Sequence, residues 1–249
     1  MIKKKLAIFD LTDCEGCELQ IINLKEKLLR LENYLDIVNW RLVKSKNNKD
    51  DFDITIIEGN PVKKDEENTL KELRAKSKIL IALGACACTG GIPTMINETK
   101  REEFAAIVYG KDYKPKAISA KSINTIVKVD YYIPGCPADQ NQIEKVLINL
   151  INDRPPEFLT HPVCLDCKLK ENKCLLLSGE PCLGPVTQGG CGAACPSGGL
   201  YCHGCWGPMK GANLTALKNV FKRDLKWSEL ETKKHLELFW KDMEEYKRL

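Results

Sequence analysis

The chain has 249 residues, of which 43% are hydrophobic, and a formal charge of +4. This length suits one α/β domain followed by a smaller unit, and no apolar run reaches the roughly 20 residues that a membrane-spanning helix needs. Lysine and arginine are interspersed with aspartate and glutamate, which excludes the clustered basic pattern typical of nucleic-acid binding.

Apolar runs and amphipathic segments alternate over the first 151 residues. The predicted strands are residues 5–11, 35–43, 54–57, 78–83 and 129–133. Apolar residues at helical spacing predict helices that start near Cys17 and that cover residues 64–77 and 138–151. This alternation is typical of a doubly wound, flavodoxin-like parallel sheet. Residues 97–125 fit neither pattern, and we expect an irregular or partly helical insertion there.

The character of the chain changes after the proline pair at residues 155–156, which marks a linker. We therefore expect a flavodoxin-like domain at residues 1–153 and a small, irregular, cysteine-rich domain at residues 154–249 that ends in helices. Apolar residues at helical spacing after Leu214 predict the first of these helices. The capping-box pair Ser228 and Glu231 predicts the start of the second.

Thirteen cysteines are the most unusual feature of the sequence. The five in the first domain all follow predicted strands: Cys14 and Cys17 the first, Cys86 and Cys88 the fourth, and Cys136 the fifth. Because the carboxyl ends of parallel strands meet at one edge of a sheet, we expect Cys14, Cys17, Cys86 and Cys136 to form one four-thiol set. Cys88 is interpreted as a spare thiol, buried or semi-exposed, with replacement of Cys86 by Cys88 as the alternative.

The other eight cysteines lie within residues 164–205, among glycines, prolines and small residues. This segment has no periodic apolar face, so we expect a group bound to its sulfurs to hold it together. The start of the chain shows no signal-peptide pattern, and we expect a cytoplasmic protein, in which dense cysteines indicate metal rather than disulfides.

Sequence order divides these eight cysteines into two sets of four. The sets are Cys164, Cys167, Cys174 and Cys182, and Cys191, Cys195, Cys202 and Cys205. An interleaved pairing, as in two-cluster ferredoxins, is the alternative. Four thiolates suit either a cubane iron–sulfur cluster or structural zinc, and spacing alone leaves both open.

Several motifs resemble those of nickel–iron hydrogenase small subunits. The proximal-cluster signature of that family is similar to Cys14-Glu-Gly-Cys17, Gly84-Ala-Cys86-Ala with Gly90-Gly-Ile-Pro93, and Pro134-Gly-Cys136-Pro137. The stretch that starts at Cys182-Leu-Gly-Pro-Val-Thr187 and the closing Cys202-x-x-Cys205 resemble the medial and distal region. The resemblance covers roughly residues 1–210, and related signatures occur in the homologous subunit of respiratory complex I.

The resemblance implies three [4Fe–4S] clusters. The proximal ligands would be Cys14, Cys17, Cys86 and Cys136, the distal ligands Cys164, Cys167, Cys174 and Cys182, and the medial ligands Cys191, Cys195, Cys202 and Cys205. Membrane-associated and periplasmic members have a histidine where Cys164 stands, and they often lack a cysteine in the region of Cys195. Both departures resemble cytosolic group-three enzymes of the sulfhydrogenase or viologen-reducing type. His161 is interpreted as a loop histidine without a ligand role.

The implied function is electron transfer, with no catalytic residue in this chain and the Ni–Fe site in a separate large subunit. A flavoprotein of the NAD(P)H diaphorase type, or a subunit of the heterodisulfide-reductase or ferredoxin type, would be the electron partner. The alternatives are a complex-I-like electron-transfer subunit without hydrogenase activity and a zinc-stabilised interaction module. Glu15, Glu18 and Glu58 lie near the predicted proximal set and are interpreted as surface carboxylates, with proton transfer or large-subunit docking as the alternative.

Overall fold

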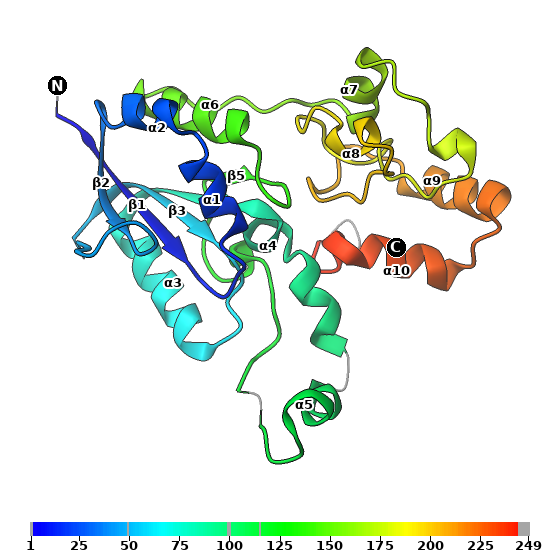
Figure 1. The fold of residues 1–249 in the computed structure, drawn as a ribbon, viewed down its shortest axis with the longest axis horizontal. Helices are drawn as coiled ribbons and strands as arrows, with labels where there is room; N and C mark the ends of the chain where they lie inside the picture. Colours follow the sequence, from blue (N-terminus) through cyan, green and yellow to red (C-terminus); the bar gives the residue numbers. More distant parts are fainter. Residues whose placement is uncertain (1, 49, 99–100, 115, 244–249) are drawn as a thin grey trace.

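A five-stranded parallel sheet forms the centre of the first half of the molecule (Figure 1). The computed structural model of the chain describes residues 2–48, 50–98, 101–114 and 116–243. The strands are β1 (Lys4–Asp10), β2 (Leu35–Trp40), β3 (Phe52–Glu58), β4 (Ser77–Leu83) and β5 (Tyr131–Ile133). Their order is β2-β1-β3-β4-β5, which is the flavodoxin-like order. The predicted fold class is therefore confirmed.

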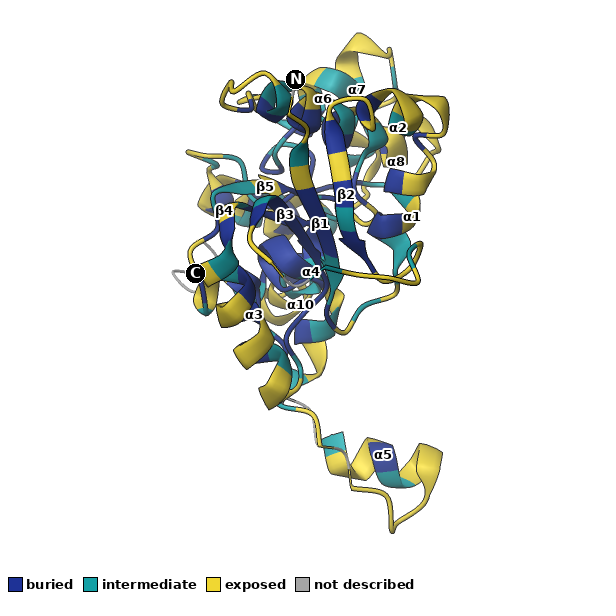
Figure 2. Cartoon of the chain, turned by 90° about the vertical axis from the view of Figure 1, so that its left-hand side faces the viewer, coloured by how far each residue is buried: buried dark blue, intermediate teal, exposed yellow. Residues whose placement is uncertain are grey.

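Helices cover both faces of the sheet, and the strands alternate their side chains between them. On one face, Leu6 and Ile8 of β1 pack beneath α1 (Gly16–Ile22), α2 (Glu26–Leu31) and α6 (Gln140–Ile151). The other face is covered by α3 (Lys64–Lys76) and α4 (Gly84–Thr89). Figure 2 shows the strands as a largely buried layer.

Three local features differ from the sequence expectations. The helix predicted near Cys17 is interrupted at Lys25, whose φ of 53° is left-handed, so α1 and α2 are separate. Strand β2 ends at Trp40 because the Trp40 carbonyl accepts turn hydrogen bonds from the amides of Val43 and Lys44, at 3.1 and 2.8 Å. Helix α4 was not predicted, since six residues are too few to show helical periodicity.

The insertion after α4 is partly helical, as expected. It contains the 3₁₀ segments η1 (Ile92–Glu98) and η2 (Ile123–Thr125) and the helix α5 (Arg101–Tyr109). Residues 99, 100 and 115 of the predicted insertion lie outside the described residues. Helix α5 stands away from the rest of the molecule (Figures 1 and 2).

The second half has short helices and a core of its own. Its elements are α7 (Val163–Leu169), η3 (Leu176–Ser178), α8 (Ala194–Ser197), α9 (Leu214–Val220), the π-helical turn η4 (Phe221–Leu225) and α10 (Glu229–Trp240). The capping box of Ser228 and Glu231 is present at the start of α10, as predicted.

The cysteine-rich segment does bury apolar side chains, which corrects the expectation that bound groups alone hold it together. Val163, Leu183 and Val186 share a core with residues of the tail helices, such as Phe221 and Trp240. Their partners lie far along the chain, so no local pattern indicates the contact.

The C-terminal residues also contact the first half. Ala85 of α4 belongs to the core of the second half, and α10 packs against α4 and η1. The Asp242 carboxylate accepts hydrogen bonds from the Ser122 amide and hydroxyl, at 2.8 and 2.7 Å. The tail therefore braces the loops that leave the sheet after β4.

Arg74 is predicted to stabilise the junction of α3, β4 and β5. Its guanidinium donates to the Asp130 carboxylate and the Ser77 carbonyl, each at 2.5 Å, and both charged side chains are about four-fifths buried. We expect Arg74→Ala to lower the free energy of unfolding by about 1–3 kcal/mol at pH 7, as measured by urea denaturation. No change would contradict this role.

The same ion pair gives the expected effect a pH dependence. Burial opposes ionisation of Asp130, but hydrogen bonds from Arg74 and the Leu80 amide hold its pKa below the ordinary value. A depressed carboxylate pKa stabilises the fold above the unfolded value of about 3.9, and this stabilisation is lost as the pH falls through the folded pKa. The difference between wild type and Arg74→Ala should therefore shrink below about pH 4.

Candidate functional site

The first set of thiols lies at the carboxyl edge of the sheet. Cys14 precedes α1, Cys17 lies in its first turn, Cys86 lies in α4, and Cys136 follows β5. Cys17 is buried, Cys86 is partly exposed, and Cys14 and Cys136 are exposed. The strand order thus brings together three loops that are far apart in sequence, as the sequence predicted.

These four thiols lie within electrostatic range of one another. Burial, followed by the thiols of Cys136 and Cys14, raises the pKa of Cys86 to about 12. Burial, followed by the Glu58 carboxylate, raises the pKa of Cys17 far above its ordinary value, and Cys86 adds to this rise. A metal that binds here must displace these protons, so metal loading should weaken as the pH falls.

Glycines let the backbone approach these sulfurs. A Cβ at Gly84 would collide with the Cys17 sulfur, and the φ of Gly84 is +81°. In the second half, a Cβ at Gly184 would lie 3.3 Å from the Cys164 sulfur and 3.4 Å from the Cys182 sulfur. A side chain at Gly84 would occupy space next to one thiol, and a side chain at Gly184 would occupy space next to two, so both glycines leave room for a group bound through sulfur.

Gly84→Ala is expected to displace Cys17 and to reduce iron binding by the first set, lowering the total by up to about four irons per chain. Gly211→Ala is the matched control, because Gly211 has a similar φ of +77° but a Cβ there would meet no heavy atom within 4 Å. Iron content after anaerobic reconstitution measures the effect. Equal losses in both variants would show that backbone strain, and not the sulfur contact, is responsible.

Glu18 and Glu58 are buried, so their interpretation as surface carboxylates was wrong. Their exposed fractions are 0% and 2%. Glu58 accepts hydrogen bonds from the amides of Cys17 and Glu18, at 3.0 and 2.6 Å, and Glu18 accepts one from the Trp40 indole at 2.7 Å. Glu58 therefore caps the start of α1, where the Glu15 side chain makes no capping hydrogen bond. Glu15 itself is partly exposed at the surface, and its carboxylate lies 3.4 Å from the Arg41 guanidinium.

Burial also changes the acidity of the carboxyl groups beside the first set. It raises the pKa of Glu18 to about 7, against the hydrogen bond from Trp40. Burial and the Glu58 carboxylate raise the pKa of Asp13 to about 7. Asp13 was not singled out from the sequence, although its position one residue before Cys14 indicated closeness to the set.

The cysteines of the second half separate into two neighbourhoods. Burial, followed by Cys182, Cys167 and Cys174, raises the pKa of Cys164 to about 11. Cys174 therefore lies in one neighbourhood with Cys164, Cys167 and Cys182.

Cys191, Cys195 and Cys205 form the other neighbourhood. Burial raises the pKa of Cys205 to about 12, and the thiols of Cys191 and Cys195 contribute to the rise. Burial also raises the pKa of Cys202, with Cys182 and Cys205 as nearby thiols. Cys195 therefore lies with Cys191 and Cys205, and Cys202 lies between the two neighbourhoods.

The three sets form a row. The backbone of Cys136, from the first set, lies close enough to the Cys205 thiol to oppose the rise of its pKa. At the other side, the amide of Cys202 donates to the Cys182 sulfur at 3.3 Å. The set that contains Cys191, Cys195, Cys202 and Cys205 thus lies between the other two.

Trp206 packs at the junction of the first set and the second half, and it was not singled out from the sequence. It is 7% exposed. A Cβ at Gly135 would lie 3.1 Å from its indole nitrogen, and one at Gly190 would collide with its ring. A single tryptophan among glycines has no periodic signal that would have identified it.

Cys88 and His161 lie outside the three sets. Cys88 is buried in the core on the opposite face of the sheet from Cys17, and its thiol donates to the Ala82 carbonyl at 3.4 Å. The His161 ring nitrogen contacts the Asp166 carboxylate at 2.8 Å, and Asp166 also accepts from the Gly190 amide at 3.0 Å. His161 therefore holds a loop through Asp166 rather than pointing at a thiol.

The donor chemistry suits soft metals. Thiolates favour iron–sulfur clusters and zinc over calcium or magnesium, and the glycines at 84 and 184 leave room beside the sulfurs. Within the described residues, no three His, Cys, Asp or Glu side chains are arranged to hold a single metal ion. None of the helices in the described ranges is long and apolar enough to cross a membrane.

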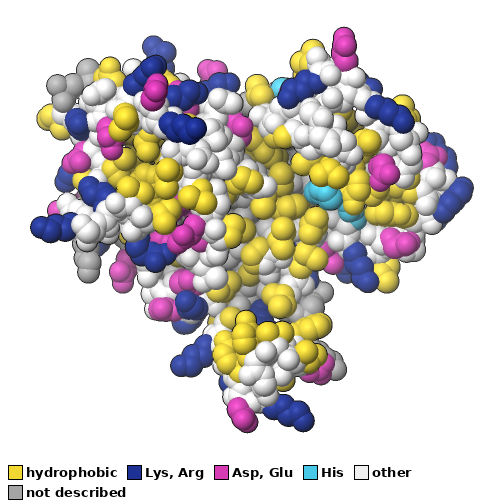
Figure 3. All heavy atoms as spheres, in the orientation of Figure 1, with side chains coloured by type: hydrophobic (Ala, Val, Ile, Leu, Met, Phe, Trp, Pro, Cys, Tyr) yellow, Lys and Arg dark blue, Asp and Glu magenta, His cyan; other side chains and the backbone are white. Residues whose placement is uncertain are grey.

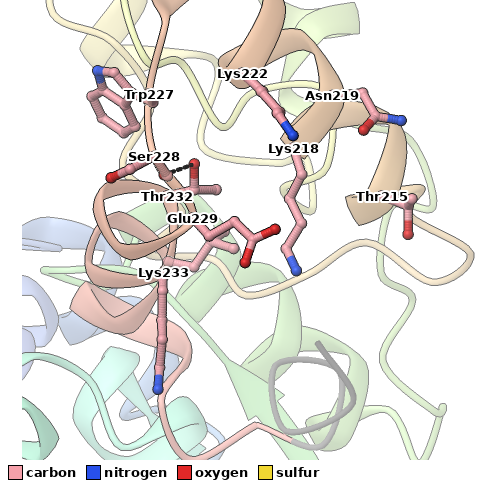
Figure 4. Close-up of a pocket in the computed structure, with 10 residues that line it drawn as sticks. Thr215, Lys218, Asn219, Lys222, Trp227, Ser228, Glu229, Thr232 and Lys233 are labelled. Carbon is pink, nitrogen blue, oxygen red and sulfur yellow. Dashed lines mark hydrogen bonds between the residues drawn. The ribbon is translucent and has the colours of Figure 1, made fainter.

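A cavity of about 680 Å³ lies between α9 and α10, and none of its lining residues is a cysteine. Figure 4 shows Lys218 and Glu229 pointing into this space. The nearby Thr232 hydroxyl donates to the Ser228 carbonyl at 3.1 Å. The charged residues of its lining are Lys218, Lys222, Lys233 and Glu229, and no thiol or imidazole joins them. The thiols, and not this cavity, carry the chemistry of the chain.

The fold and the row of thiols define a flavodoxin-like subunit rich in soft metal ligands, and comparison with known proteins identifies its family. The profile of the family described as NADH ubiquinone oxidoreductase, 20 Kd subunit, matches residues 14–150. The chain is 39% identical to the sulfhydrogenase 2 subunit delta of Pyrococcus furiosus, over 92% of this chain and 97% of that protein. It is 35% identical to a subunit of the F420-non-reducing hydrogenase vhu of Methanocaldococcus jannaschii, over 82% of this chain and 81% of that protein.

A solved structure agrees with these relatives. A chain of an NAD+-reducing [NiFe]-hydrogenase in the H2-reduced state superposes with a TM-score of 0.58 and 27% identity, over 64% of this chain and 96% of that chain. The chain described here belongs to the 20-kDa NADH:ubiquinone oxidoreductase subunit family and, within it, to the small subunits of group-three nickel–iron hydrogenases. Small subunits of this class bind iron–sulfur clusters and assemble with a large hydrogenase subunit, so the chain is part of an oxidoreductase.

Proposed function

We propose that this chain relays electrons between the Ni–Fe site of a large subunit and a second redox partner through three [4Fe–4S] clusters. The first set would hold the proximal cluster, Cys191, Cys195, Cys202 and Cys205 the medial cluster, and Cys164, Cys167, Cys174 and Cys182 the distal cluster. When bound, such clusters supply one-electron transfer at potentials that charge, hydrogen bonds and burial adjust. The observation that carries this proposal is the row of three four-thiol sets.

The residues of the chain hold and shield the three sets. Neighbouring residues link them in order: Cys136 lies near Cys205, and the Cys202 amide donates to the Cys182 sulfur. Glu58 fixes the start of α1 beside Cys17. Cys17, Cys182 and Cys202 are buried, so the protein excludes water from one side of each set.

The two ends of the row differ in what would cover them. Cys14 and Cys136 are exposed, which suits contact with the large subunit.

We propose that residues 1–153 and 154–249 act as two domains, with the electron partner bound at the second. A nicotinamide-linked flavoprotein is supported by the NAD+-reducing structural relative, with a heterodisulfide-reductase or ferredoxin-type subunit as the alternative. We propose a cytoplasmic complex, since a cysteine replaces the histidine that begins the distal set in exported members.

Purification of the tagged chain with its natural partners under anaerobic conditions tests this function. We expect a nickel-containing large subunit to co-purify in stoichiometric amount and the complex to reduce viologen dyes with H2. A complex that transfers electrons but contains no nickel would overturn the hydrogenase function.

A complex that transfers electrons but contains no nickel would favour a complex-I-like subunit, the alternative that the family description supports. The sequence of the co-purified large subunit would decide between the two. Nickel sites need soft or imidazole-type ligands, and a large subunit without cysteine pairs for nickel would belong to the complex-I-like kind.

A further inference from the structure

A helical arm projects from the carboxyl edge of the sheet. We use "the arm" for residues 101–114, which comprise α5 and the turn after it. Figures 1 and 2 show it standing clear of both halves of the molecule. It belongs to the insertion between α4, which carries Cys86, and β5, which Cys136 follows.

The base of the arm is held by hydrogen bonds. The Arg101 guanidinium donates to the carbonyls of Ala117 and Ile118, at 2.8 and 3.0 Å. The Asn97 side chain donates to the Ala120 carbonyl at 2.6 Å and accepts from the Ala120 amide at 2.8 Å. The two stretches of chain that lead into and out of the arm are therefore fixed to each other, and the arm is presented in a defined direction.

The arm exposes apolar side chains along most of its length. Ile107 is 79% exposed, Val108 and Tyr109 are each 69% exposed, and Phe104 is 54% exposed. Ala105 is the residue of α5 that is buried. A nine-residue helix gains little stability in water without packing of its apolar face, so this face fits a surface that another protein covers.

The apolar surface of the arm continues to the first set of thiols. Ile92 and Met95 of η1 are 47% and 43% exposed, and η1 begins directly after Gly91, where a Cβ would lie 3.1 Å from the Cys86 amide nitrogen. Among the described residues, eight of the 24 exposed large hydrophobic side chains lie between Ile92 and Tyr113. Figure 3 shows apolar side chains gathered on the protrusion and on the body above it.

We propose that the arm is a docking surface for the nickel–iron large subunit. A protein that covers the exposed Cys14 and Cys136 must approach the carboxyl edge of the sheet, and the apolar surface from Ile92 to the arm extends from the same edge. The occupant is thus the subunit that faces the first set, held by an apolar contact outside the redox site. The inference rests on the proposed function, because that function supplies the large subunit.

The test places two carboxylates on the arm. Ile107→Glu together with Val108→Glu is expected to reduce co-purified nickel per tagged chain about tenfold or more, because buried charges disfavour an apolar interface. Iron bound by the tagged chain itself, after subtraction of the iron that leaves with the large subunit, should stay at the wild-type value, since neither side chain contacts a thiol set. The control is Leu29→Glu together with Leu230→Glu, at positions that are 65% and 59% exposed on α2 and α10. It should keep both metals.

The outcomes separate the arm from the proposed function. Wild-type nickel retention in the arm variant would overturn the docking proposal and leave the hydrogenase function standing. Retained nickel with a halved particle mass would also overturn it, by showing that the arm binds a second copy of the complex. A wild-type chain that purifies without nickel would instead overturn the proposed function, and with it the occupant named here.

Discussion

Replacing Cys86 with serine is expected to abolish H2-dependent dye reduction, with a loss of about 100-fold or more, and to lower the iron content by about four per chain. The reason is that Cys86 lies near Cys14 and Cys136 at the edge of the sheet, within electrostatic range of both. A serine hydroxyl is a harder ligand that stays protonated near pH 7, whereas iron–sulfur clusters are held by thiolates. Dye reduction and iron content of the purified complex measure the two effects.

Cys88→Ala is the matched control, two residues further along α4. Its thiol is directed at the Ala82 carbonyl within the core on the other face of the sheet. We expect wild-type iron content and dye reduction within about twofold, with a small loss of stability from the missing buried sulfur. If Cys88→Ala lost iron and Cys86→Ser kept it, the assignment of these two thiols would have to be reversed.

The second large effect is expected for Trp240→Ala, which should lower the free energy of unfolding by about 3–5 kcal/mol. Trp240 is fully buried in the core of the second half. Its indole donates to the Gly204 carbonyl at 2.6 Å, and Gly204 lies between Cys202 and Cys205. Removal of the ring leaves a cavity beneath this loop, so iron release to a chelator should also become faster.

Trp227→Ala serves as the comparison for this variant. Trp227 is partly buried, and its ring packs edge-on against Phe221 with centroids 5.3 Å apart. A smaller loss of about 1–2 kcal/mol is expected there, with iron release at the wild-type rate. Similar iron release in the two variants would mean that bound groups, and not the apolar core, hold the loop of Cys202 and Cys205.

The sheet and the first set of thiols could be predicted because two simple rules apply to them. Apolar runs that alternate with amphipathic segments predict a parallel sheet, and such a sheet gathers its strand ends at one edge. Cys14, Cys86 and Cys136 follow different strands, so their meeting depends on topology alone. The capping box at Ser228 could also be predicted, because it is a local sequence pattern.

The features that could not be predicted depend on contacts between distant residues. Glu18 and Glu58 are typical surface residues by type, and their burial arises because β3 ends directly beneath the start of α1. Val163 and Leu183 carry no helical or strand period, and their partners in the tail helices lie far along the chain. The arm lies in the stretch that fits neither the strand nor the helix pattern, and only the three-dimensional arrangement reveals that its apolar side chains face outward.

The most direct test of the three-cluster relay is the iron and acid-labile sulfide content of the anaerobically purified complex, counted for this chain alone. The three proposed four-thiol sets take up twelve of the thirteen cysteines, and we predict about twelve irons and about twelve sulfides per chain. About four irons, all lost in Cys86→Ser, would mean that only the first set binds a cluster. Zinc with no sulfide in the second half would likewise contradict the relay.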